Sequence, residues 1–265
     1  MEGKKGKPVG VMDSGMGGLT VVKELERLLP KEDIIYFGDN ANVPYGNRPE
    51  KEILELSCAM LDFLRKQDVK VVAIACNTIS ALAGQLRKRY EFPIVSIIEA
   101  ACDYVAGKGL SQVGVIATEF TIQQGMYKTL LQRIRPEIQV HGIASRTLAA
   151  LVDQGQLSGP AIKEEISSLV KAMQKSHPEV KDVVLGCTHY PIVQDLFEQA
   201  APGLCFINPA EAQAKAVMAI LSERGLLTDS SQPGLDIYTS GEKQLYDAML
   251  KKLQIKRSYT ITLKG

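Results

Sequence analysis

Two short stretches, Ala75-Cys76-Asn77-Thr78 and Gly186-Cys187-Thr188-His189, decide how this chain folds. Each closes an apolar run that begins Val-Lys, at Val69 in one case and at Val180 in the other. Both runs have the residue types of a buried strand, and each cysteine is the last residue before a segment with a helical pattern. The two stretches therefore predict equivalent strand-to-helix junctions.

A second pair of similar stretches supports an internal duplication. Val9-Gly10-Val11-Met12-Asp13-Ser14 resembles Val113-Gly114-Val115-Ile116-Ala117-Thr118, and nearly the same length of chain separates these two stretches as separates the two cysteines. Two strand ends repeated at one offset indicate two similar half-units. If the half-units face each other, the two cysteines flank one cleft.

Composition excludes several classes of protein. The chain has 265 residues, 45% hydrophobic and 23% charged, with a net charge of +1, so it has no basic surplus for nucleic acid or an anionic membrane. No apolar run is long enough to cross a membrane, and no signal-peptide core follows the basic start. The five cysteines are odd in number and form no CxxC pair, which indicates reduced thiols in a cytoplasmic protein.

Predicted strands and helices alternate along the chain. Strands are predicted at 8–12, 33–37, 69–75, 93–98, 113–117, 139–143, 182–185, 206–209, 235–239 and 258–263. Helices are predicted at 19–29, 50–67, 78–90, 100–106, 121–133, 147–154, 160–174, 210–224 and 242–253, with another from Pro191. This alternation predicts βαβ units with mostly parallel sheets, and the pattern restarts near residue 100.

Polar residues stand where the predicted strands end. Asp13, Asp39, Cys76, Thr118 and Cys187 all fall at or just beyond a strand end. Ligands of parallel α/β sheets bind outside the carboxyl ends of the strands. These residues are therefore expected to lie around one binding site.

The two cysteines have the surroundings of activated thiols. At the start of a helix, unpaired amide donors and the helix dipole favour a thiolate. Asp13, at the end of the first strand, is the expected partner of Cys76. His189 follows Cys187 by two residues, on the same side of an extended backbone, and is expected to reach its sulfur.

Two activated thiols that face each other suit the inversion of a carbon stereocentre. One thiolate removes a proton from one face of the carbon, and the other thiol delivers a proton to the opposite face. Hydroxyl and amide groups beside the thiols, from Ser14, Asn77, Thr78 and Thr188, are candidates to bind carboxylates. The turn from Gly15 to Gly18 is expected to bring backbone donors close to an anion.

Other chemistry is open to the same residues. A cysteine hydrolase of Cys187, His189 and Asp13 would not need Cys76 and would form a covalent acyl-enzyme. Cys76, Cys187 and His189 are ligand types that suit zinc, although their wide spacing disfavours a metal site. A binding protein would hold its ligand without exchange at carbon. The remaining cysteines and histidines are expected to have packing or surface roles: Cys58, Cys102, Cys205, His141 and His177.

Five motifs, in this order, resemble those of bacterial glutamate racemase, within the cofactor-independent aspartate/glutamate racemase superfamily. They are Asp13–Val21, Tyr36–Asp39, Val43–Gly46, Ala75–Thr78 and Gly186–Pro191. The resemblance runs from about residue 9 to Tyr238-Thr239-Ser240-Gly241 and so covers nearly the whole chain.

The resemblance implies an activity and a set of site residues. Cys76 would abstract the α-proton of D-glutamate and Cys187 that of L-glutamate, with Asp13 and His189 assisting. It implies no cofactor and no metal. The substrate-binding residues that it implies are Asp13, Ser14, Tyr45, Gly46, Asn77, Thr78, Thr118, Thr121, Thr188 and His189.

The resemblance also implies an architecture and a role. The expected fold is α/β, with two similar doubly wound, mostly parallel-sheet domains flanking a central cleft. The second domain, residues 102–211, would be inserted in the first, residues 1–101 plus 212–265. The product would supply D-glutamate for peptidoglycan, and the expected form is a cytoplasmic homodimer.

Some positions depart from the family pattern. Asp153, beside the site, stands where glutamate is usual and is shorter by one methylene. Ser145-Arg146 replaces a common Cys-Pro pair, Asn42 stands where arginine is frequent, and Glu119-Phe120 lies in a stretch that is usually small and polar. None of these changes removes a thiol. A racemase of the same superfamily that acts on aspartate or another small acid would also keep both cysteines.

Overall fold

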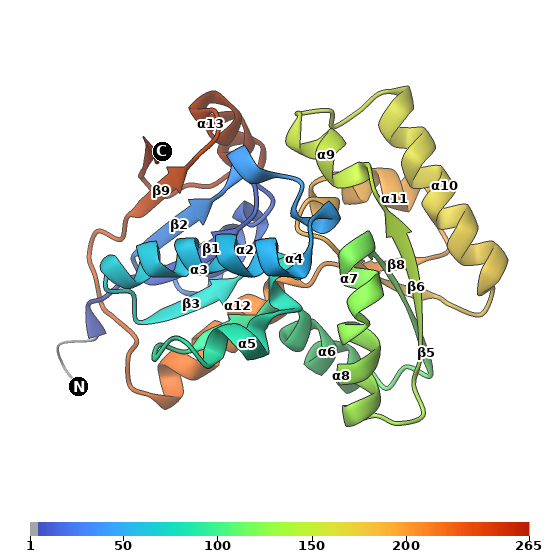
Figure 1. The fold of residues 1–265 in the computed structure, drawn as a ribbon, viewed down its shortest axis with the longest axis horizontal. Helices are drawn as coiled ribbons and strands as arrows, with labels where there is room; N and C mark the ends of the chain where they lie inside the picture. Colours follow the sequence, from blue (N-terminus) through green and yellow to red (C-terminus); the bar gives the residue numbers. More distant parts are fainter. Residues whose placement is uncertain (1–4, 265) are drawn as a thin grey trace.

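The computed structural model describes residues 5–264 and contains two parallel β-sheets. The first has six strands in the order β10-β9-β2-β1-β3-β4, and the second has four in the order β6-β5-β7-β8. We call each sheet with its helices a unit (Figure 1). The strands are β1 (Val9–Asp13), β2 (Ile34–Gly38), β3 (Val71–Ile74), β4 (Ile94–Ser96), β5 (Gln112–Thr118), β6 (Gln139–Ser145), β7 (Asp182–Gly186), β8 (Cys205–Ile207), β9 (Leu235–Thr239) and β10 (Tyr259–Leu263).

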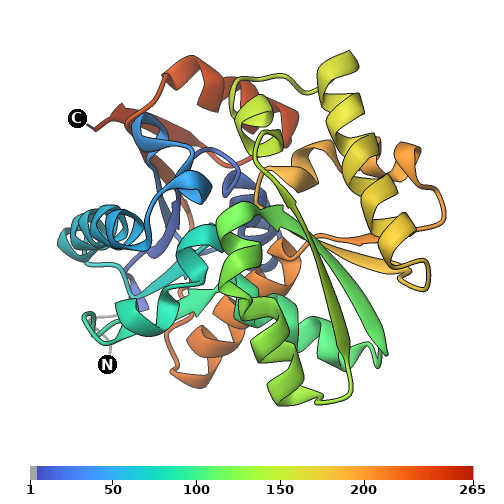
Figure 2. The same ribbon diagram turned by 45° about the vertical axis from the view of Figure 1, so that its right-hand side comes forward.

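Helices cover both faces of both sheets, which confirms the predicted fold class (Figure 2). The α-helices are α2 (Leu19–Leu28), α3 (Glu50–Lys66), α4 (Asn77–Ser80), α5 (Ala83–Arg87), α6 (Ile97–Gly107), α7 (Glu119–Gln124), α8 (Met126–Ile134), α9 (Leu148–Asp153), α10 (Pro160–Ser176), α11 (Gln194–Ala200), α12 (Ala210–Glu223) and α13 (Lys243–Lys252). Short 3-10 turns are η1 (Asn40–Asn42), η2 (Tyr45–Asn47) and η3 (Tyr190–Val193).

Strand β1 shows why the first sheet forms an interior layer. All five of its residues are buried. Val9 and Val11 belong to the hydrophobic cluster that includes α2 and α12, whereas Met12 belongs to the cluster on the α3 side. Successive side chains of a strand point to opposite faces, so a continuous apolar run fits a sheet that is covered on both faces.

Two predicted helices are each broken into two. The helix predicted at 121–133 is interrupted at Gly125, whose φ of 64° lies in the left-handed region and ends α7. The helix predicted at 78–90 consists of α4 and α5. The Ser80 hydroxyl there donates to the Ile74 carbonyl and accepts from the Ile97 amide, so it binds backbone outside its own helix.

The chain passes from the first unit to the second at α6 and returns at α12. Helix α12 packs against both α2 and α6, and its Gln213 amide donates to the carbonyls of Ile74 (2.8 Å) and Val95 (2.9 Å). The returning segment adds β9 and β10 beside β2 (Figure 2). The predicted domain boundaries, after residues 101 and 211, fall inside α6 and α12. We propose that these two helices form the junction between the domains.

Among residues 5–264, no helix is both long enough and apolar enough to cross a bilayer.

Candidate active site

A cavity of about 320 Å³ lies between the two units, where β1, β3, β5 and β7 end. Both Cys76 and Cys187 line it, so the structure brings the two predicted thiols to one site. The other predicted residues that line it are Ser14, Tyr45, Gly46, Asn77, Thr78, Thr118, Asp153, Thr188 and His189.

Asp13 does not line the cavity, but its hydrogen bonds connect the two units on either side of it. Its carboxylate accepts hydrogen bonds from the amides of Gly15 (3.2 Å) and Gly18 (3.0 Å) and from the Thr188 hydroxyl (3.1 Å) of the other unit. Burial raises the pKa of Asp13. Two amides of the glycine-rich turn, which the sequence analysis expected to face a bound anion, thus bind Asp13.

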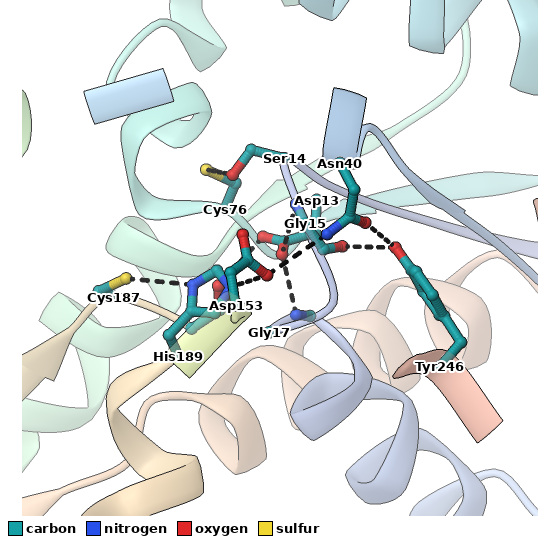
Figure 3. Close-up of polar contacts among 12 residues, drawn as sticks. Asp13, Ser14, Gly15, Gly17, Asn40, Cys76, Asp153, Cys187, His189 and Tyr246 are labelled. Carbon is teal, nitrogen blue, oxygen red and sulfur yellow. Dashed lines mark hydrogen bonds and ion pairs between the residues drawn. The ribbon is translucent and has the colours of Figure 1, made fainter. Parts of the chain in front are cut away.

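Cys76 lies against Ser14, whose hydroxyl oxygen is 3.4 Å from the sulfur (Figure 3). Burial and the nearby Asp13 carboxylate raise the pKa of the Cys76 thiol to about 12, although the Ser14 hydroxyl and the Ile79 amide lower it. Helix α4, whose N-cap is Cys76, is a single turn. Burial therefore outweighs the effect of the helix terminus, and Cys76 is held as a thiol.

Cys187 has a different helper. His189 Nδ1 is 3.6 Å from the Cys187 sulfur, and His189 Nε2 is 2.9 Å from Asp153 Oδ1 (Figure 3). The sequence predicted this Cys-His contact from an extended backbone, but His189 has helical angles (φ −76°, ψ −31°) and reaches the sulfur from a turn. The predicted neighbour is present, on a different local geometry.

The Asp153 carboxylate sets the protonation of His189. Burial lowers the pKa of His189, but the charges and hydrogen bonds of Asp153 and Cys187 together outweigh burial, and the pKa lies well above its ordinary value. Because a carboxylate only accepts, Nε2 carries a proton and Nδ1 is left to exchange a proton with Cys187. Gly15 makes room for this pair, since a Cβ there would lie 2.9 Å from both Asp153 oxygens.

Three threonines form a hydroxyl cluster on another wall. Thr118 Oγ1 lies 3.1 Å from Thr78 Oγ1 and 2.9 Å from Thr121 Oγ1, so the cluster joins the two units. Thr121 is buried behind the cavity lining. The neighbouring Tyr45 donates to Asp39 at 2.6 Å, and burial raises the pKa of Tyr45. Thr78 and Thr118 of this wall therefore offer hydroxyl donors to an anionic ligand.

Several polar residues at the site were not among the predicted ones. The Tyr127 hydroxyl donates to Asn77 Oδ1 at 2.7 Å, and Asn77 Nδ2 is buried with no partner within residues 5–264. Arg146 lines the cavity and pairs with Glu119, Nε to Oε2 at 2.6 Å. Asn40 also lines the cavity. Tyr127 lies in the first turn of α8, away from any strand end, so the sequence carries no strand-end signal for it.

The metal alternative finds no support in the part of the chain that is described. Within residues 5–264, no group of three or more histidine, cysteine or acidic side chains is arranged to hold a metal ion.

His141 and His177 stack on each other with ring centroids 3.8 Å apart. This is a packing role, as the sequence predicted.

Fold and site together define a class: α/β proteins with a cavity between two parallel-sheet units and a buried thiol from each unit. Comparison with known families then gives a specific match. The family model described as Asp/Glu/Hydantoin racemase matches residues 9–217. The chain belongs to this family.

Individual relatives cover almost the whole chain. A glutamate racemase of Oceanobacillus iheyensis is 35% identical over 93% of this chain and 91% of its own length. One from Latilactobacillus sakei is 33% identical over 94% of this chain and 91% of its own. The crystal structure of glutamate racemase from Francisella tularensis in complex with D-glutamate has a TM-score of 0.89 and 31% identity, and the match covers 98% of each chain.

Proposed function

We propose that this protein interconverts L-glutamate and D-glutamate by proton transfer between two cysteines and Cα, without a cofactor. The observation that carries the proposal is the placement of Cys76 and Cys187 on one cavity, each from the end of an equivalent strand. The substrate follows from the relatives, which are named glutamate racemases, and from the D-glutamate complex of one of them.

In the direction from L to D, Cys187 removes the α-proton and Cys76 donates one to the opposite face. Cys187 is suited to act as the base because the His189 imidazolium, held by Asp153, stabilises a thiolate. Cys76 is suited to act as the acid because burial holds it as a thiol. In the reverse direction the two exchange roles, and the positive α-ammonium of the bound substrate favours ionisation of Cys76.

Stabilisation of the carbanion is the hardest part of this chemistry. Deprotonation at Cα moves negative charge onto the α-carboxylate, which needs oriented donors in a site that excludes water. Asn77 Nδ2 is a buried donor without a protein partner within residues 5–264. The hydroxyls of Thr78 and Thr118 supply further donors on the same walls. We assign the two substrate carboxylates to these groups.

The wider role rests on the family resemblance. We propose that the D-glutamate formed is used for peptidoglycan, and that the protein acts in the cytoplasm as a homodimer. The predicted domain division, with residues 102–211 inserted between 1–101 and 212–265, belongs to the same proposal.

Incubation of the purified protein with each glutamate enantiomer, without pyridoxal phosphate, tests the activity. Each enantiomer is expected to yield a mixture of equal amounts of both, as followed by circular dichroism. Aspartate and other small acids, tested in parallel, give the specificity, and glutamate is expected to have the highest kcat/KM. Absence of inversion with glutamate would refute the proposal, and faster inversion of aspartate would reassign the substrate.

A further inference from the structure

A chain of hydrogen bonds connects helix α13 of the first unit to the Cys187 thiol of the second (Figure 3). Tyr246 on α13 donates to Asn40 Oδ1, and Asn40 Nδ2 donates to Asp153 Oδ1 at 3.4 Å. Asp153 Oδ1 also binds His189 Nε2 at 2.9 Å. Asn40 therefore contacts the Asp153–His189 pair beside Cys187, and Tyr246 contacts Asn40.

The chemistry of these groups fixes the direction of each bond. A carboxylate only accepts, so the Asn40 amide must turn its nitrogen toward Asp153 and its oxygen toward Tyr246. Burial raises the pKa of Tyr246 well above its ordinary value, so its hydroxyl keeps the proton that it donates. The Tyr246 hydroxyl also lies 3.0 Å from the Gly15 carbonyl, but Asn40 Oδ1 is the nearer of the two acceptors. The proton of Tyr246 is therefore available for Asn40.

The backbone is shaped around this chain of contacts. A Cβ at Gly38 would lie 1.9 Å from the Tyr246 hydroxyl, and a Cβ at Gly241 would lie 2.5 Å from Asn40 Cβ. Contacts this short do not occur, so a side chain at Gly38 would displace Tyr246, and one at Gly241 would displace Asn40. Tyr246 is completely buried. Both positions leave space that Asn40 and Tyr246 occupy.

We propose that Asn40 and Tyr246 are positioning residues for proton transfer at Cys187, because they hold Asp153, and through it His189, against that thiol. The inference rests on the proposed two-cysteine function. Asn40 and Tyr246 come from the first unit, whereas Asp153 and His189 come from the second. The hydrogen bonds that hold the Asp153–His189 pair therefore form only when the two units are closed on each other. Cys76 and Ser14, in contrast, lie in one unit.

Isotope effects distinguish this role from a general structural one. Tyr246→Phe removes only the hydroxyl, and kcat/KM is expected to fall by about fivefold, the worth of roughly one hydrogen bond. Slower transfer at Cys187 makes proton removal from L-glutamate more rate-limiting. The isotope effect on kcat/KM with Cα-deuterated L-glutamate therefore rises, and that with Cα-deuterated D-glutamate falls. Asn40→Ala is expected to change both isotope effects in the same directions.

Tyr36→Phe is the matched control. It also removes a buried tyrosine hydroxyl bonded to the Gly15 carbonyl, but Tyr36 makes no hydrogen bond to Asn40. Its two isotope effects are expected to equal those of the unaltered protein. In an Asp153→Asn background, Tyr246→Phe is expected to have little further effect. Equal changes for both enantiomers in Tyr246→Phe, or the same change in Tyr36→Phe, would overturn the inference.

A second measurement does not depend on activity. The chain has three histidines, so nuclear magnetic resonance of its ¹⁵N-labelled imidazoles resolves His189, with His189→Asn giving the assignment. Tyr246→Phe is expected to lower the pKa of His189, because a loosened Asp153 stabilises the imidazolium less, and Tyr36→Phe is expected to leave it unchanged. An unchanged pKa in Tyr246→Phe refutes the positioning role. If the pKa falls but no glutamate is inverted, the proposed function fails and the positioning of His189 stands.

Discussion

Replacing Asp153 by asparagine removes the charge behind His189 and keeps the shape of the side chain. A single oxygen, Oδ1, accepts from both His189 Nε2 and Asn40 Nδ2, and an asparagine keeps such an oxygen. The substitution therefore exchanges a charge-assisted hydrogen bond for a neutral one without opening a cavity. The side chains of His189 and Asp153 are only 5% and 9% exposed, so solvent screens their interaction little.

The size of the effect follows from that exchange. A hydrogen bond to a charged group contributes about 1.5–3 kcal/mol, and one between neutral groups about 1 kcal/mol. The loss of about 0.5–2 kcal/mol corresponds to a fall of about 2- to 30-fold in kcat/KM. The pKa of His189 falls as well, because the charge and hydrogen bond of Asp153 are the largest of the effects that raise it.

The pH profile gives the sign of the change. If the imidazolium of His189 supports the Cys187 thiolate, activity is lost as pH rises through the pKa of His189. In Asp153→Asn that alkaline limb of kcat/KM moves to lower pH. Racemisation followed by circular dichroism across pH measures it. Glu137→Gln is the control, since Glu137 pairs with Arg135 and neither residue lines the cavity, so its profile is expected to stay unchanged. An alkaline limb at the same pH in Asp153→Asn would refute this role of Asp153.

Four further substitutions test separate parts of the site and fold. Cys76→Ser and Cys187→Ser are each expected to abolish racemisation with either enantiomer, and full activity in one variant would remove that cysteine from the mechanism. Gly15→Ala places a Cβ 2.9 Å from both Asp153 oxygens and is expected to lower kcat/KM by roughly 10- to 100-fold in a folded protein, so unchanged kinetics would contradict the contact. Lys70→Met leaves the buried Glu32 carboxylate without its ammonium partner, and urea unfolding is expected to show a loss of about 3–5 kcal/mol; a stability within error of the original would show that the pair contributes nothing.

The fold was largely predictable because strands buried on both faces leave continuous apolar runs in the sequence. Each predicted strand has its counterpart in the structure. Helix interruptions were harder to predict. Gly125 adopts a left-handed conformation that only the folded chain reveals, and Ser80 binds backbone groups of β3 and α6, outside its own helix. Such breaks depend on tertiary contacts, which local periodicity does not record.

The site residues likewise divide into those that the sequence predicts and those that depend on tertiary contacts. Cys76, Cys187 and His189 were predictable because each stands at or near a strand end, where parallel sheets present ligand-binding side chains. Their immediate partners depend on how the units close. Ser14 lies against Cys76, whereas Asp13 binds the glycine-rich turn and Thr188. Asn40 and Tyr246 reach the site from a loop and from a C-terminal helix, so no sequence motif joins them.

The central claim is that two different groups transfer the proton on the two faces of Cα. A brief reaction of protiated L-glutamate in heavy water tests it most directly, with the recovered substrate and the inverted product separated and their Cα deuterium measured by mass spectrometry. Two bases predict that the D-glutamate formed carries deuterium while the remaining L-glutamate is still protiated, with the mirror result from D-glutamate. Inverted product that retains the original proton would contradict the account.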